Sequence, residues 1–416
     1  MSESPEPDTS MRALLRQGDF VRFWISRWTA VLAVQIQSVA LGWHIYSIAR
    51  QTMDVPRSAF MVSLIGLVSF VPVLFLALPA GEAADRYDRR TILKFTYAGE
   101  IAIAALLAVA SFTGHASIPL LLGSAFLFGI CRAFFAPANT ALGPMLVPRE
   151  LLPRAIAWNS LAWQTASIAG PALGGVLVAY STGLSYAVAL ALYAVAALTI
   201  LLIRSNTQPQ VQPGSRWALM KEGLVYVWTN KIVFGAISLD LAAVILAGAT
   251  AMLPVYARDV LHVGPEGFGI LRAGPAIGAA MMAFYLAAVP IHRKAGVIMF
   301  ISVGVFAVGT IVFGLSKLMW LSVAALVVLG AADMISVYIR QTLIQLVTPD
   351  HMRGRVATVS SLFIGASNEL GEFRGGVVAR FIGPVAAVVW GGVGALMVTG
   401  LWAKLFPDLR KADRLA

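Results

Sequence analysis

Nine ionisable residues lie inside long apolar stretches of the sequence, where a charged side chain is costly and usually serves a function. Groups of this kind form ion pairs, bind polar ligands, or take up and release protons. Five are acids and four are arginines: Glu100, Arg132, Asp240, Arg272, Asp333, Arg340, Glu369, Glu372 and Arg374. The chemistry of each one depends on the partner that the fold places beside it.

An internal repeat relates two of these charges. A shift of 201 residues lays residues 129–176 on residues 330–377 without a gap, and it lays Arg132 on Asp333. Equivalent positions of related helices face each other across a pseudo-two-fold axis if both line a cavity. We predict that Arg132 and Asp333 pair in one conformational state, and that breaking the pair lets Asp333 bind a proton. The alternative is a static bridge, or separate partners on adjacent helices.

Asp240 is a second candidate for proton transfer. No lysine or arginine lies three or four residues away from it, so its own helix offers no counter-charge. An unpaired carboxylate in an apolar medium favours its protonated form, which suits a proton carrier. The alternative is a structural hydrogen bond to a neighbouring helix.

Glu369 and Glu372 are three residues apart and share one face of a helix. Two carboxylates that lie so close need counter-charges, which Arg272, Arg340 and Arg374 offer. We expect Glu369, Glu372, Arg374 and Arg340 to form a structural polar network, with direct binding of a ligand as the alternative.

Membrane-spanning helices must position these residues. The chain of 416 residues is 59% apolar and 12% charged, whereas soluble domains are about 45–50% apolar and about 25% charged. A membrane span needs about 20 apolar residues. We predict twelve, near residues 22–49, 58–84, 91–113, 117–140, 154–180, 183–203, 231–257, 267–290, 295–315, 318–346, 355–379 and 383–406. The sequence therefore predicts an all-α membrane protein with twelve transmembrane helices in two pseudo-symmetric six-helix bundles.

The basic residues predict the domain order and orientation. Cytoplasmic loops are rich in lysine and arginine, and with the N-terminus inside, 22 of the 31 basic residues fall on the cytoplasmic side and five on the other. We expect both termini in the cytoplasm of a multi-pass protein of the bacterial inner membrane. The predicted parts are a tail at 1–21, bundles at 22–203 and 231–406, a cytoplasmic linker at 204–230, and a second tail at 407–416.

The sequence lacks the motifs that are typical of several classes of function. The chain has no phosphate-binding loop of the type GxxxxGK[ST] and no histidine pair with metal-ligand spacing on one helix, and Cys131 is its single cysteine. We expect no enzymatic activity, metal or cofactor. The net charge of +11 fits loops beside an anionic leaflet rather than a nucleic-acid groove. The expected partners are a small molecule and the bilayer, and the expected state is a monomer.

Two motifs resemble those of the major facilitator superfamily. After the second predicted span, residues 81–90 read GEAADRYDRR, which resembles the family loop GxxxDRxGRR/K that latches the two halves in the outward-open state. The matching residues are Gly81, Asp85, Arg86, Arg89 and Arg90, and Asp88 stands where the pattern has glycine. The alternative reading is an ordinary positively charged cytoplasmic loop.

The second motif lies in the fifth predicted span. Gly170, Pro171, Gly174 and Gly175 resemble the antiporter motif GPxxGG, in which proline bends the helix and glycines admit a neighbour. Across its length the sequence is similar to the drug/proton antiporter branch that includes the enterobactin exporter and the macrolide efflux proteins.

The resemblance implies alternating access and proton-coupled export of a small amphipathic molecule, such as a drug, a macrolide or a siderophore. The energy source would be the proton gradient. In this family the first span borders the cavity, which makes Gln35 and Trp43 possible cargo contacts; a packed aromatic interface is the alternative for that span. Other functions compatible with the sequence are lipid flipping or import on the same fold, and, in a different class, a membrane sensor without transport.

Overall fold

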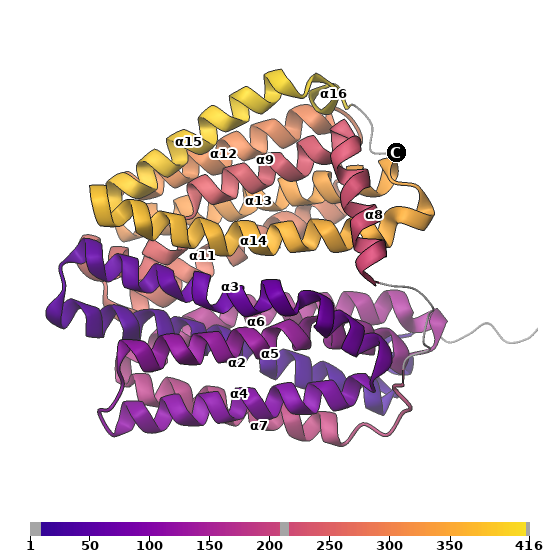
Figure 1. The fold of residues 1–416 in the computed structure, drawn as a ribbon, viewed down its shortest axis with the longest axis horizontal. Coiled ribbons are helices and arrows are strands. Elements are labelled where there is room, and N and C mark those ends of the chain that lie inside the picture. The colour runs from indigo at the N-terminus through magenta and orange to yellow at the C-terminus, as the bar shows by residue number, and fades with distance from the viewer. Residues whose placement is uncertain (1–9, 209–215, 413–416) are drawn as a thin grey trace, which may run out of the picture.

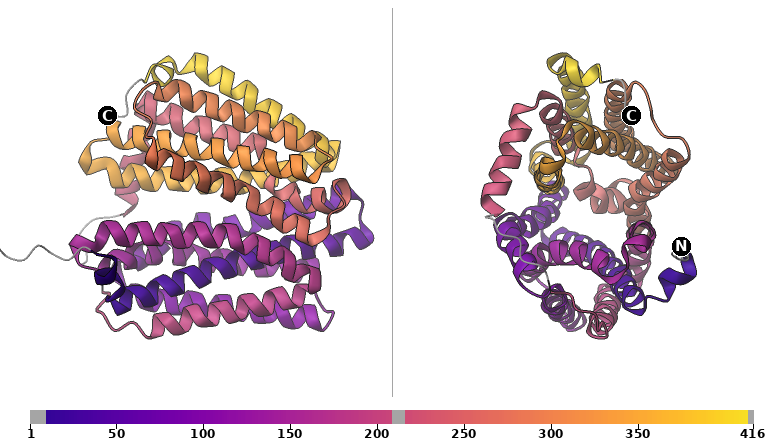
Figure 2. Two further views of the ribbon diagram at one scale, coloured as in Figure 1. Left: turned by 180° about the vertical axis from the view of Figure 1, so that it is seen from behind. Right: turned by 90° about the vertical axis from the view of Figure 1, so that its right-hand side faces the viewer.

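Helices form almost the whole molecule. The computed structural model describes residues 10–208 and 216–412, and this part of the chain contains no β-strand. Figure 1 shows two bundles of long helices, one above the other, and the right-hand view of Figure 2 looks roughly along their axes. This confirms the predicted all-α membrane fold with two bundles.

The first bundle holds the N-terminal half of the chain. A short helix, α1 (Met11–Leu15), precedes it, and two 3₁₀ turns, η1 (Gly143–Leu146) and η2 (Arg149–Leu151), precede its fifth helix. The long helices are α2 (Gly18–Thr52), α3 (Val55–Arg86), α4 (Arg89–Phe112), α5 (Ile118–Leu142), α6 (Leu152–Tyr180) and α7 (Thr182–Leu201).

The second bundle holds the C-terminal half. Its long helices are α9 (Lys231–Ala247), α11 (Gly264–Ala288), α12 (Ala295–Leu315), α13 (Met319–Val347), α14 (Asp350–Ile382) and α15 (Pro384–Leu405). Between α9 and α11 the chain forms η3 (Thr250–Met252), α10 (Leu253–Val255) and the π-helix η4 (Tyr256–Val260), and α16 (Pro407–Arg410) follows α15.

The predicted linker also contains a helix. Residues 216–229 form α8 (Arg216–Thr229), which packs on α9, α14 and α3. Glu222 of α8 pairs with Arg355 of α14 at 2.7 Å. Figure 1 shows α8 crossing from one bundle towards the other at one end of the molecule, which we call the linker side.

Eleven helices in the described residues are long and apolar enough to cross a membrane. They correspond to eleven of the twelve predicted spans. The remaining span, predicted near 355–379, lies in α14, which carries Glu369, Glu372 and Arg374 in one stretch. A twelfth crossing by α14 stays a prediction, although α14 packs against the transmembrane candidates α3, α9 and α15.

The internal repeat is visible in the packing. α6 packs on α2 of its own bundle and on α11 of the other, and α14 packs on α9 of its own bundle and on α3 of the other. Matched glycines sit at these crossings. A Cβ on Gly170 would collide with Gln35 of α2, and a Cβ on the equivalent Gly371 would lie 2.6 Å from the carbonyl oxygen of Val244 of α9.

The next pair of glycines lies where the two halves meet. A Cβ on Gly175 would lie 2.8 Å from the Cα of Gly269 on α11, and a Cβ on Gly376 would collide with Ser63 on α3. Small residues let helices approach closely. The motif Gly170–Gly175 therefore positions α6 between the two halves, and its repeat in α14 does the same on the other side of the axis.

Candidate functional site

A central cavity of about 530 Å³ lies between the two bundles. Helices α2 to α6 form its N-terminal wall, and η3, α10, α11 and α14 form its C-terminal wall. Three acids and three arginines line it: Arg27, Glu100, Arg132, Arg272, Glu369 and Glu372. The cavity is therefore lined by acids and arginines in equal number, although, among the residues that the structure describes, not each acid forms an ion pair.

The N-terminal wall shows where the cavity extends. On α2 the lining residues run from Arg27 to Gly42, and on α5 they continue to Thr140, close to the end of the helix at the linker side. Tyr46 and Arg50, further along α2, do not line it. The cavity therefore extends towards the linker side, and the opposite end of α2 makes its contacts outside the cavity.

The opposite end, which we call the closed end, joins the halves by polar contacts. Tyr46 of α2 donates a hydrogen bond to Asp259 of η4 at 2.5 Å, and Arg50 pairs with Asp259 at 3.3 Å. The guanidinium of Arg258 lies 6.0 Å from the centre of the Tyr46 ring. π-helical turns are rare and occur mostly at functional positions, and this one presents Asp259 to the other half.

Aromatic residues complete the closed end. Trp43 stacks on Phe268 with ring centres 6.0 Å apart, and Phe60 of α3 contacts Phe373 of α14 at 6.3 Å. Trp43 is not among the residues that line the central cavity in this conformation, so its contact with cargo stays a prediction. Gln35 does line the cavity, as does Trp163 of α6, which the sequence had not singled out.

Arg132 bridges the two halves through a partner that differs from the prediction. Its Nη1 lies 2.7 Å from Oε1 of Glu369 on α14. The predicted pair with Asp333 is not present in this conformation. Glu369 comes close to α3, because α14 packs on that helix and a Cβ on Gly66 would lie 3.2 Å from Oε2 of Glu369.

Glu372 lies one turn further along α14. Glu369, Arg272 and Arg132 are near enough to Glu372 for their charges to affect it. Arg132, which pairs with Glu369, therefore also attracts Glu372. Glu372 also lines a second cavity of about 370 Å³ inside the C-terminal half. It thus stands between the central cavity and a buried compartment.

The second cavity contains the two remaining acids. Asp240 of α9 pairs with Arg340 of α13, and Asp333, also on α13, lies on the same cavity within reach of both charges. We call Asp240, Asp333 and Arg340 the C-terminal cluster. Two carboxylates share one guanidinium there, so the ionised cluster has one negative charge in excess.

The C-terminal cluster corrects two predictions. Asp240 is not unpaired, because its partner comes from another helix 100 positions away in the sequence. The residues of the predicted network of span eleven are also separated. Arg340 forms its ion pair with Asp240. Arg374 donates a hydrogen bond to the backbone oxygen of Leu246 at 2.5 Å. Of the predicted network, Glu369 and Glu372 lie together, beside Arg132 of α5 and Arg272 of α11.

Glu100 is the functional candidate that the sequence left open. It lies on α4, is 3% exposed and lines the central cavity. Its Oε2 atom has no hydrogen-bond partner, and no ion pair of Glu100 is found among the described residues. No repeat partner or local spacing marks this residue, and its single signal in the sequence is an acid within an apolar span.

The family-like loop connects α3 to α4. Arg86 pairs with Glu82 at 2.7 Å, Arg89 donates to the backbone oxygen of Ala84 at 3.2 Å, and Arg90 donates to the backbone oxygen of Ile203. Gly81 is buried near the end of α3, and Asp85 follows one turn later. These contacts lie within the N-terminal half, so they hold the ends of α3, α4 and α7 together.

Asp88 explains the departure of this loop from the family pattern. It is the N-cap of α4 and accepts a hydrogen bond from the backbone N–H of Arg90 at 3.0 Å. Thr207 donates to the same carboxylate. Aspartate is a favourable N-cap, so this side chain stabilises the start of the helix where the family has glycine.

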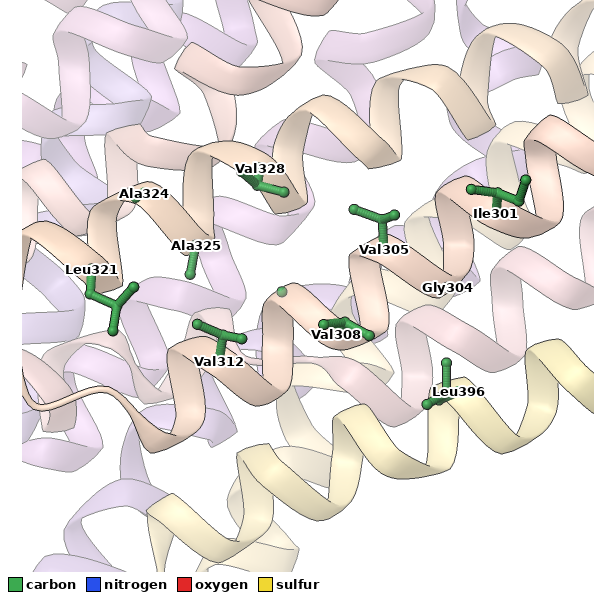
Figure 3. A pocket seen from close by; sticks show the side chains of 11 residues that line it. Ile301, Gly304, Val305, Val308, Val312, Leu321, Ala324, Ala325, Val328 and Leu396 are labelled. Carbon is green, nitrogen blue, oxygen red and sulfur yellow. The ribbon is translucent and has the colours of Figure 1, made fainter.

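A third cavity has a different character. It measures about 500 Å³ and lies between α12, α13 and α15, where Figure 3 shows only apolar side chains and a glycine backbone around it. Ile301, Val305 and Leu396 are among its lining residues. No group in it binds a proton or a polar ligand, so the chemistry of the molecule lies in the two charged cavities.

Comparisons with known proteins agree with this arrangement. The chain is 27% identical over 406 residues to the enterobactin exporter EntS of Citrobacter koseri, covering 94% of this chain and 92% of the relative. It is 26% identical over 403 residues to EntS of Shigella boydii, with the same coverage.

Solved structures show the same fold at low identity. A bacterial homologue of the human lysosomal transporter Spinster, in an inward-facing and unoccupied conformation, matches with a TM-score of 0.73 at 14% identity, covering 94% of this chain and 98% of the other. An inward-facing bacterial homologue of the iron transporter ferroportin matches with a TM-score of 0.71 at 14% identity, covering 95% and 99%.

The family model described as a transmembrane secretion effector matches residues 9–416, nearly the whole chain. Together with the two bundles and the central cavity, this makes the protein a membrane transporter and not an enzyme. The chain belongs to the transmembrane secretion effector family of the major facilitator superfamily.

Proposed function

We propose that the protein exports a small amphipathic molecule by alternating access, driven by the proton gradient across the bacterial inner membrane. The observation that carries this proposal is the ion pair between Arg132 and Glu369, which joins the two halves across a cavity closed at one end. A contact that must break when the halves separate suits a transporter that alternates between two states.

The orientation follows from the basic residues. The linker side carries α8, α16 and most of the loop lysines and arginines, which favours a cytoplasmic position. The cavity then extends towards the cytoplasm, and Tyr46, Arg50 and Asp259 close the outer side. Cargo would enter from the cytoplasm and leave after the closed end opens.

The C-terminal cluster is the proposed site of proton coupling. One proton on Asp333 would neutralise the excess charge that Asp240, Asp333 and Arg340 carry together. Glu372 lines both charged cavities and offers a route between them. Cargo binding near Arg132 and Glu369 would then alter the charges that face Glu372, and so link cargo release to proton uptake.

The direction of transport rests on two observations. The relatives named above are exporters of enterobactin, and the residues Gly170–Gly175 match the antiporter motif. The six charges in the central cavity disfavour a lipid tail as cargo, because burying an acyl chain among them would desolvate charges without pairing them.

Reconstitution tests the proposal. Purified protein in liposomes is given an imposed pH gradient and offered fluorescent dyes, macrolides, catecholate siderophores and lysolipids in turn. We expect the gradient to drive accumulation of at least one of the first three, and a proton ionophore to abolish it. If no cargo moves with protons, the antiporter assignment is wrong; if lysolipids alone move, the protein is a flippase.

A further inference from the structure

The N-terminal wall of the central cavity holds a carboxylate that the proposed transport cycle does not use. Glu100 is 3% exposed, lines the cavity, and leaves its Oε2 atom without a hydrogen-bond partner. A buried polar group without a partner costs free energy unless it has a role. The other two acids of this cavity lie beside Arg132 and Arg272, whereas Glu100 forms no ion pair within the described residues.

The side chains around Glu100 supply no cation that pairs with it. The charge of Glu100 acts on three neighbouring side chains: Tyr97 of its own helix, Cys131 of α5 and Tyr193 of α7. Arg27 of α2 also lines the cavity, and its charge acts on Tyr97. No ion pair between Arg27 and Glu100 occurs in the described part of the chain.

A second acceptor lies on the same wall. Asn139 of α5 is 6% exposed, lines the cavity, and leaves its Oδ1 atom without a donor. Each of these acceptors, Glu100 in the middle of α4 and Asn139 near the end of α5, suits a ligand group that donates hydrogen bonds. At Glu100 a protonated amine fits best, because it donates hydrogen bonds and also neutralises the carboxylate.

We propose that Glu100 is the recognition site for a protonated amine of the cargo, which places cationic amphipathic amines among the substrates. This inference rests on the proposed transport through the central cavity. The amine would sit against the N-terminal wall, while the body of the cargo faces Arg132, Glu369 and the aromatic ring of Trp163. Cargo recognition and proton coupling would then lie in different halves.

The test uses matched pairs of probes on the purified full-length protein. Doxorubicin and puromycin are each compared with their N-acetyl derivative, which retains most of the shape and loses the charge. Apparent affinity is obtained from the rise of the thermal unfolding midpoint with ligand concentration. We expect wild-type protein to bind at least one amine about tenfold more tightly than its acetylated form, because one charge-assisted hydrogen bond contributes enough free energy for that difference in affinity.

Three variants separate recognition from folding. Glu100→Gln should bind the amine and its acetylated form equally, and Glu100→Asp, which keeps the charge, should retain a preference for the amine. The control Glu150→Gln changes an exposed acid outside the cavity and should bind like wild type. The assignment is overturned if wild type binds neither amine, if it binds charged and neutral forms equally, or if Glu100→Gln keeps the preference.

The result also separates this inference from the transport proposal. A preference for amines that depends on Glu100, without any pH-driven movement, would contradict proton coupling and leave the recognition site standing. Transport driven by the pH gradient, without a charge preference, would contradict the recognition site alone.

Discussion

Three ion pairs of this protein differ in burial, and the difference indicates which ones move. Arg340 and Asp240 join two helices of the same half and are 2% and 10% exposed. Arg132 and Glu369 join the two halves across the cavity, and their side chains are 50% and 14% exposed. Arg50 and Asp259 at the closed end are 25% and 21% exposed, so in each pair between the halves at least one side chain is open to water. Pairs between the halves therefore remain open to water, which lowers the cost of breaking them in each cycle.

The largest expected effect comes from the buried pair. Arg340→Ala leaves Asp240 and Asp333 without a counter-charge in the C-terminal half. Breaking a buried ion pair by removing one partner costs about 3–5 kcal/mol of stability. We expect a much lower thermal unfolding midpoint and poor yield, measured in detergent by tryptophan fluorescence.

A double variant distinguishes charge from packing. Replacing a buried pair by apolar residues is often neutral, so Asp240→Leu with Arg340→Leu should recover most of the stability that Arg340→Ala loses. Equal instability of the single and double variants would contradict an ion-pair origin of the effect.

The closed end should show an intermediate effect. Asp259→Asn weakens the hydrogen bond from Tyr46 and removes the pair with Arg50. Hydrogen bonds to charged groups contribute about 1.5–3 kcal/mol, so the population with an open outer end should rise by tenfold or more. Folding should change little, because both partners can reach water.

Spin labels at two exposed positions measure this opening. The pair Gln51→Cys and Lys317→Cys, in a Cys131→Ser background, reports the distance between the halves at the closed end. Asp259→Asn should increase the long-distance population, while Glu266→Gln, an exposed acid at the same end, should not. An unchanged distribution would show that Asp259 does not hold the halves together.

The pair that spans the cavity should contribute least to stability. Exposed ion pairs contribute about 0–1 kcal/mol, so Arg132→Ala should leave the unfolding midpoint nearly unchanged. A double-mutant cycle with Glu369→Ala measures the coupling between the two residues. A coupling above about 2 kcal/mol would mean that this pair is as rigid as the one formed by Asp240 and Arg340.

The salt dependence of the two ion pairs tests the same difference in burial. Ions screen exposed charges over about 10 Å at 0.1 M and screen buried pairs much less. Raising the salt concentration should therefore reduce the coupling between Arg132 and Glu369, and should leave the destabilisation caused by Arg340→Ala nearly constant. Equal salt dependence of the two effects would remove the distinction between them.

The helices and their symmetry could be predicted from the sequence. Long apolar stretches require helices in a membrane, and the gapless repeat placed Gly170 and Gly371 at equivalent positions, where they now admit α2 and α9. Arg132 was also expected to reach across the cavity. These features depend on local composition and on similarity within the chain, which a single sequence contains.

The partners of the charges could not be predicted. Glu369 is 237 positions from Arg132, and Arg340 is 100 positions from Asp240, so helix packing alone decides these pairs. The repeat suggested Asp333 for Arg132, but in this conformation Arg132 pairs with Glu369 of α14, a helix that the repeat aligns with α6 rather than with α5. For the same reason nothing in the local sequence showed that Oε2 of Glu100 has no hydrogen-bond partner in the described part of the chain.

The most direct test of proton coupling compares Asp333→Asn with wild type in liposomes. Cargo is added under a pH gradient, and proton flux and cargo flux are recorded together. Asp333→Asn should still exchange cargo without a gradient but no longer accumulate it or move protons, whereas Asp350→Asn, which changes an exposed acid on α14, should behave as wild type. Accumulation driven by protons in Asp333→Asn would contradict the assignment of coupling to the C-terminal cluster.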